Sequence, residues 1–138
     1  MKLILPLLAF LSIMVSVSSC KKFIEDKKEE FVLNMLTNGN WKVESFFIDN
    51  TDSTVLFEEY KFVFTKTGIV NCINNLTTKS GTWKEDLEAY SITTHFPDAV
   101  EPLHLLNGEW KIIDGYFDYC EAKMNRNGKT QVMMLKKQ

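Results

Sequence analysis

Arginine is almost missing from this sequence, and the remaining charge is close to balanced. Of 138 residues, 16 are lysine or arginine and 18 are aspartate or glutamate, so the formal net charge is −2 at pH 7. Arg126 is the only arginine. Proteins that bind nucleic acid gather basic side chains on one face, because the phosphate backbone supplies much of the affinity. The composition therefore argues against a nucleic-acid partner.

Residues that usually carry catalysis are also scarce. The sequence has two histidines, His95 and His104, and three cysteines. It contains no phosphate-binding glycine loop, no nucleophile elbow and no paired spacing of zinc ligands. The two histidines flank a proline-containing segment with Asp98 and Glu101, which could hold a metal only if that loop brought them together. We therefore expect no enzyme, no cofactor and no bound metal.

A long apolar run is confined to the beginning of the chain. Lys2 precedes apolar residues 3–17, a run of signal-peptide length that is short for a transmembrane helix of about 20 residues. The run ends in Val17-Ser18-Ser19-Cys20, which resembles the lipobox of bacterial lipoproteins. The resemblance implies that residues 1–19 are removed as a signal peptide. It also implies that Cys20 then receives acyl chains such as palmitate.

Lipidation of Cys20 would anchor the protein to a membrane of the bacterial cell envelope. Each buried methylene of an acyl chain contributes about 0.8 kcal/mol, so several chains hold a protein firmly. Lys21 follows the cysteine, where some lipoproteins kept in the inner membrane have aspartate. The resemblance therefore favours the outer membrane over the inner one. A cleaved secretory signal and an uncleaved anchor are the alternatives.

Two short segments precede the folded domain. Residues 21–30, KKFIEDKKEE, are charged and predict a tether. Apolar residues at helical spacing between residues 23 and 36 predict one short helix, which Asn38-Gly39 would end. We therefore divide the chain into a signal peptide (1–19), a lipidated cysteine with tether and short helix (20–37), and a folded domain (38–138).

After residue 38 the apolar pattern acquires a period of two, which is typical of strands. Eight strands are predicted, at 41–48, 60–64, 69–73, 81–84, 87–94, 105–113, 116–124 and 129–136. Asp114-Gly115 has the composition of a two-residue hairpin turn. Mostly short connections make neighbouring strands antiparallel. The sequence thus predicts an all-β fold, either an eight-stranded up-and-down barrel or a sandwich of two four-stranded sheets.

Every tryptophan follows a glycine by two residues, in Gly39-Asn40-Trp41, Gly81-Thr82-Trp83 and Gly108-Glu109-Trp110. Residues two apart share a face of a strand, so the glycine leaves room beside the indole. The order of these segments resembles that of lipocalin-like domain lipoproteins of Bacteroidota, over about residues 38–137. The resemblance implies a lipocalin-like barrel. The sequence departs from it in the last strand, where Lys136 and Lys137 stand in place of the arginine that lipocalins commonly pack over the first tryptophan.

Large apolar residues on one face of the predicted strands are expected to line the barrel interior. They are Trp41, Phe47, Tyr60, Phe62, Phe64, Trp83, Tyr90, Ile92, Trp110 and Ile112. We expect them to bind a small apolar ligand in the barrel or at its mouth, if a cavity of about 300 Å³ or more is present. The alternative is a protein-interaction module of the envelope, an accessory subunit or inhibitor, with a filled interior. Its clue would be Phe46, Ile48 and Val63, which the alternation places on the outer face.

Cys72 and Cys120 remain once Cys20 is set aside. An exported protein meets an oxidising compartment, where an even number of cysteines favours a disulfide. The third and seventh predicted strands are not neighbours, however, and α-carbons more than about 7 Å apart cannot be bridged. Two interpretations stay open, a disulfide and a pair of buried thiols.

Overall fold

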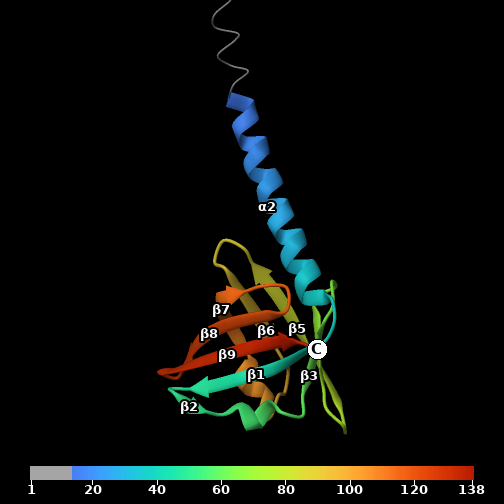
Figure 1. Ribbon diagram of the computed structural model, residues 1–138, viewed down its shortest axis with the longest axis vertical. Helices are drawn as coiled ribbons and strands as arrows, with labels where there is room; N and C mark the ends of the chain where they lie inside the picture. The colour runs from blue at the N-terminus through green and yellow to red at the C-terminus, as the bar shows by residue number, and fades with distance from the viewer. Residues whose placement is uncertain (1–13) are drawn as a thin grey trace, which may run out of the picture. The chain divides into compact units, whose positions relative to one another are not determined.

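The computed structural model describes residues 14–138, with side chains from residue 26 onward (Figure 1). The chain separates into two compact units at Val32, and each unit is described by itself. Residues 1–13 of the expected signal peptide lie outside the described residues. Removal of residues 1–19 and lipidation of Cys20 therefore stay predictions.

Helix α2 (Met14–Thr37) is longer than the sequence pattern indicated. The charged run at 21–30, expected to be a tether, is helical throughout. Neither glycine nor proline interrupts the segment, and Lys27 and Glu30, one turn apart, form an exposed ion pair of 3.1 Å. The helix predicted between residues 23 and 36 is confirmed as part of α2, but its extension through the charged run was not predicted, because that run lacks a sustained apolar face. No helix within residues 14–138 combines the length and apolar character needed to span a membrane.

Eight antiparallel strands form a closed barrel. They are β1 (Trp41–Ile48), β3 (Lys61–Phe64), β4 (Ile69–Ile73), β5 (Thr78–Asp86), β6 (Ser91–His95), β7 (Gly108–Gly115), β8 (Tyr119–Arg126) and β9 (Lys129–Lys137). A two-residue strand, β2 (Thr51–Asp52), folds back on the end of β1. Neighbours in sequence pair in order, and β1 closes the sheet by pairing with β9 from Trp41↔Lys137 to Ile48↔Gln131. The predicted all-β barrel is confirmed, and the sandwich is excluded.

The connections define two ends of the barrel. At the end we call the floor, Leu33–Thr37 leads into β1, and the turns 65–68, 87–90 and 116–118 join strands. At the end we call the mouth lie the four connections 49–60, 74–77, 96–107 and 127–128. Two 3-10 helices belong to the mouth: η1 (Thr54–Phe57), the short green helix below β1 in Figure 1, and η2 (Leu103–Leu106).

A β-bulge in β1 changes which phenylalanine faces the interior. Strict alternation from Trp41 predicts Phe47 inside and Phe46 outside. The register between β1 and β9 shifts between Val43 and Ser45. One extra residue in a strand turns each later side chain to the opposite face. Phe46 is consequently fully buried, whereas Phe47 is only half-buried, so both predictions are wrong.

The predicted strand at 87–94 begins four residues late. Residues 87–90 form the turn between β5 and β6. The Asp86 carboxylate accepts a hydrogen bond of 2.9 Å from the Ala89 backbone N–H, which stabilises this turn. Tyr90 has a positive φ of 52° and a side chain that is 58% exposed, so its predicted place in the interior is wrong.

The predicted hairpin at Asp114-Gly115 is part of β7 instead. Gly115 pairs with Cys120, and a second bulge lies between Ile112 and Asp114. The turn occupies residues 116–118 and is closed by a backbone hydrogen bond between residues 116 and 119. At its other end β7 begins at Gly108 rather than at residue 105, because residues 103–106 form η2.

Candidate functional site

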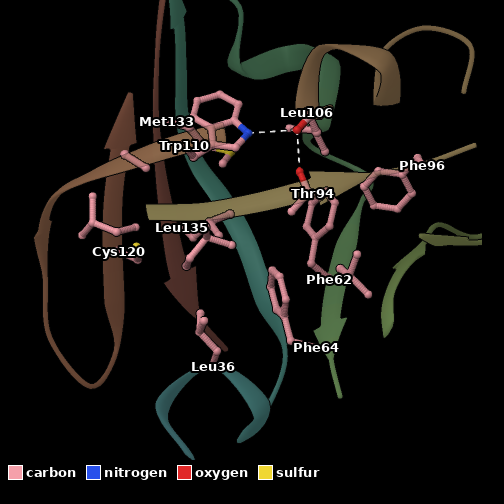
Figure 2. Close-up of a pocket in the computed structure, with 14 residues that line it drawn as sticks. Leu36, Phe62, Phe64, Thr94, Phe96, Leu106, Trp110, Cys120, Met133 and Leu135 are labelled. Atoms are coloured by element: carbon pink, nitrogen blue, oxygen red, sulfur yellow. Dashed lines mark hydrogen bonds between the residues drawn. The ribbon is translucent and has the colours of Figure 1, made fainter. Parts of the chain in front are cut away.

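The barrel interior contains a small apolar cavity of about 40 Å³. Fourteen residues line it, and Figure 2 draws them as sticks: Leu36, Phe62, Phe64, Val70, Ile92, Thr94, Phe96, Leu106, Trp110, Ile112, Cys120, Ala122, Met133 and Leu135. Sites for drug-sized ligands occupy about 300–1,000 Å³. The cavity is therefore a residual space in a packed core, well below the volume of such a ligand.

The residues expected to line the interior fall into three groups. Phe62, Phe64, Ile92, Trp110 and Ile112 line the cavity. Trp41 and Trp83 are buried in the barrel but do not reach the cavity. The third group, Phe47, Tyr60 and Tyr90, is half-buried or exposed. The interior thus contains seven of the ten predicted residues, five of which line the cavity.

Several cavity residues were missed by the sequence interpretation. Met133 and Leu135 come from β9, where Gln131 continues the same buried alternation, so period two could have identified them. Phe96 and Leu106 come from the proline-containing connection 96–107, which carries no strand signal. Leu36 belongs to the last turn of α2 and is fully buried beneath the barrel floor.

The three indoles attach connecting segments to the barrel. Each Nε1–H donates a 2.9 Å hydrogen bond to a backbone carbonyl, and the pairs are Trp41 to Leu36, Trp83 to Thr65 and Trp110 to Leu106. Figure 2 shows the last of these bonds at the mouth. The other two act at the floor. A buried indole thus satisfies its donor while fixing a helix end, a hairpin turn or a 3-10 helix.

At two of the glycines beside these indoles, Gly81 and Gly108, a larger side chain would clash with neighbouring atoms. A Cβ on Gly81 would lie 2.5 Å from the carbonyl oxygen of His95 and 2.8 Å from the ring of Phe96. Gly108 has a φ of +131°, and a Cβ placed on it would lie 2.7 Å from the sulfur of Met124. These two glycines therefore permit close approach of neighbouring segments beside Trp83 and Trp110.

Lys137 covers the first tryptophan, where the resemblance implied an arginine. Its Nζ lies 4.9 Å from the centroid of the Trp41 ring and donates a 3.1 Å hydrogen bond to the Met35 carbonyl. The ammonium thus meets both the face of the indole and a free carbonyl at the end of α2. Lys137 thus covers the Trp41 ring with a flexible side chain and a single ammonium group, instead of the planar guanidinium of an arginine.

The connection 96–107 closes the mouth of the barrel. Three of its own residues, Phe96, Leu103 and Leu106, are buried. The fully buried Gln131 donates a 2.9 Å hydrogen bond from Nε2 to the Leu105 carbonyl. The Asn107 side chain accepts from the Phe96 N–H at 2.7 Å and donates to the Phe96 carbonyl at 3.1 Å. The Asn107 bonds therefore tie the two ends of the segment together, and the Gln131 bond fixes its middle to β9.

Cys72 and Cys120 are buried free thiols, so the disulfide interpretation is wrong. Burial raises the pKa of Cys72 to about 12 and that of Cys120 to about 11, the latter with a smaller contribution from Asp114 and Glu121. The thiolate is the reactive form of cysteine, and it is rare at neutral pH when the pKa is raised. Both side chains act as small apolar core residues.

The two histidines do not come together as metal ligands. His95 is exposed on β6, and His104 is half-buried in η2. In the part of the chain that the structure describes, no three His, Cys, Asp or Glu side chains gather closely enough to hold a metal ion.

These features define a closed, eight-stranded antiparallel barrel with a packed interior. A crystal structure of a DUF4847 family protein from Bacteroides vulgatus ATCC 8482 has a similar fold, with a TM-score of 0.58 and 15% sequence identity. The match covers 78% of this chain and 99% of that one. At this identity the likeness establishes the fold alone. No family model matches the sequence, and no curated protein matches it.

Proposed function

We propose that this protein is a non-enzymatic module of the bacterial cell envelope that binds a protein partner through its surface. In this proposal the barrel is a rigid support rather than a container. The observation that carries the proposal is the cavity of about 40 Å³, which is far below the roughly 300 Å³ or more of sites that hold drug-sized ligands. The sequence suggested a ligand site and a filled core as alternatives, and this volume favours the filled core.

The closed mouth supports the same conclusion. A ligand entering from that end would have to displace the connection 96–107. This would break the bond from Gln131 to Leu105 and expose the buried Phe96 and Leu106. Fully exposing a buried Phe or Leu side chain costs about 1.5–3 kcal/mol. The interior is therefore costly to open, as expected for a structural core.

The proposed place of action comes from the sequence. The lipobox ending in Cys20 supports a lipid anchor, and Lys21 supports the outer membrane. A tethered module meets its partner at high effective concentration, since both are confined to one compartment. A non-enzymatic role is supported by the absence of catalytic motifs from the sequence.

A small apolar ligand is the second candidate. The observation in its favour is the character of the cavity wall, which is built almost entirely of aliphatic, aromatic and sulfur-containing side chains. Such a wall would suit an apolar molecule if the interior expanded. This function requires a volume that the closed barrel does not have.

Native mass spectrometry of the protein purified from its own membrane tests the proposal. We expect the mass of the chain beginning at Cys20 plus acyl groups, with no further non-covalent molecule. A stoichiometric small molecule that is released on unfolding would contradict the filled-core function and support the ligand-binding one. A Cys20→Ala variant is the matched control, because it should lose the acyl mass and leave the barrel unchanged.

A further inference from the structure

Exposed aliphatic side chains gather on the connections at the mouth. Val55 and Leu56 lie on the first connection and are 70% and 42% exposed. Leu76 lies on the second and is 91% exposed, and Val100 lies on the third and is 76% exposed. Single exposed apolar residues are ordinary on a protein surface, but four of them on the connections at one end of the barrel offer apolar contact area to a partner.

The charge of the same connections has one sign. The segments 49–60, 74–77, 96–107 and 127–128 contain six carboxylates and neither lysine nor arginine. The carboxylates are Asp49, Asp52, Glu58, Glu59, Asp98 and Glu101, and all six residues are exposed. Exposed lysines, Lys61, Lys79 and Lys129, stand at the adjoining strand ends, so the carboxylates form an acidic patch within a rim of mixed charge. An acidic patch attracts basic segments of a partner and disfavours acidic ones.

The mouth connections are held in place by contacts with the barrel or within themselves. Phe57 of η1 packs against the buried Phe46, with ring centroids 4.8 Å apart. The Asn74 side chain accepts hydrogen bonds of 2.9 and 2.8 Å from the N–H groups of Leu76 and Thr77. A preorganised contact surface loses less conformational entropy on binding than a mobile one.

We propose that the mouth connections form a docking surface for a protein partner that presents a basic segment with apolar side chains. The aliphatic residues would supply buried contact area, and the carboxylates would select the charge of the partner. The turns at the floor also expose apolar rings, those of Tyr90, Tyr116 and Phe117. The floor is nevertheless less suited to a basic partner, because its turns carry charges of both signs and the chain from α2 joins the barrel there. This inference rests on the proposed function and adds the surface and the chemistry of the partner.

Site-specific photo-crosslinking in intact cells tests the docking surface. The photoreactive residue p-benzoylphenylalanine replaces Leu76 in one variant and Val100 in another. Tyr90, which is 58% exposed at the floor, is the control position. We expect both mouth positions to give an adduct with the same protein, through a cross-linked peptide of net positive charge, and the Tyr90 position to give none.

Charge reversal supplies the second arm of the test. In the mouth variant, Glu58→Lys and Glu59→Lys are combined, and the adduct is expected to fall about tenfold because like charges now oppose each other. The matched control combines Glu88→Lys and Asp118→Lys, which makes the same change in net charge at exposed floor positions. The control should leave the adduct unchanged.

Several results would overturn the docking surface. These are the absence of an adduct from both mouth positions, an equal adduct from Tyr90, a lipid adduct, and a cross-linked peptide that is neutral or acidic. A protein adduct confined to Tyr90 would overturn the docking surface while leaving the interaction function intact. A small molecule found by native mass spectrometry would instead overturn the function itself.

Discussion

Lys137 takes the place at the barrel floor where lipocalins commonly have an arginine. Its ammonium touches the Trp41 ring and a carbonyl at the end of α2. We predict that Lys137→Ala lowers the free energy of unfolding by about 1–2 kcal/mol, since it removes a charged hydrogen bond and a cation–π contact. Urea denaturation of the purified domain measures this change.

Two comparisons separate the charge of Lys137 from its apolar stem. Lys137→Arg should retain most of the stability, whereas Lys137→Met should recover only the packing of the stem. Lys136→Ala, at the exposed neighbouring position, should change stability by less than about 0.5 kcal/mol. Equal losses at positions 136 and 137 would show that Lys137 does not hold the floor together.

Because the pKa values of the two buried thiols are raised, we predict that the free energy of unfolding falls in alkaline solution. The pKa of each is raised in the folded chain, to about 12 for Cys72 and about 11 for Cys120, against 9.0 for an ordinary thiol. The unfolded chain therefore releases these protons first, and stability that is complete below pH 9 falls as the pH rises toward the folded values. The limiting slope is about 1.4 kcal/mol per pH unit for each thiol.

A Cys72→Ala/Cys120→Ala variant isolates this effect from lysine and tyrosine ionisation. The measurement is the free energy of unfolding between pH 7.5 and pH 10.5, roughly spanning the ordinary thiol pKa. The wild type should lose more stability than the variant over this range. Parallel curves would mean that the thiols are not protected by burial.

At the scale of the strand, Gly81 sets the distance between β5 and the segment that follows β6. Gly81→Ala would place a methyl group 2.5 Å from the His95 carbonyl oxygen. We predict a loss of about 1–3 kcal/mol or more, because backbone on the facing strand must move. The midpoint of urea unfolding measures it.

Gly128→Ala is the matched control for steric crowding. Nothing lies within 4 Å of an ideal Cβ there, although the φ of +76° disfavours alanine. The control should lose about 1–2 kcal/mol from backbone strain alone. If Gly81→Ala cost no more than a typical surface substitution, the close approach of the two segments would be wrong.

Strand order could be predicted from the strand pattern, and the resemblance implied a closed barrel rather than a sandwich, but the inward-facing set could not be predicted completely. Alternation identified Phe62 and Phe64 correctly, since β3 is regular. It failed at Phe46 and Phe47, because a bulge depends on pairing with β9 and leaves no local sequence signal. The buried residues of the mouth could not be predicted for a related reason. Leu106, for example, is buried because it packs beside residues far from it in the sequence, such as Met133 and Leu135.

At the scale of the whole molecule, the packed interior separates this barrel from a ligand-binding container. Its aromatic residues fill the core or attach connections, so large rings alone did not indicate a site. What distinguishes the two functions is the volume left between the side chains. That volume is a property of the assembled barrel and cannot be read from any one strand.

A ligand titration of the wild type beside a cavity-enlarged variant tests the packed interior most directly. Leu135→Ala, at a cavity-lining position, should cost about 2–5 kcal/mol and enlarge the apolar space. Thermal unfolding is followed with benzene, a medium-chain fatty acid and a long-chain fatty acid. The wild type should not be stabilised by any of them, whereas benzene should stabilise Leu135→Ala, because an enlarged apolar cavity can bind it. Saturable stabilisation of the wild type by any of the three would contradict the packed interior.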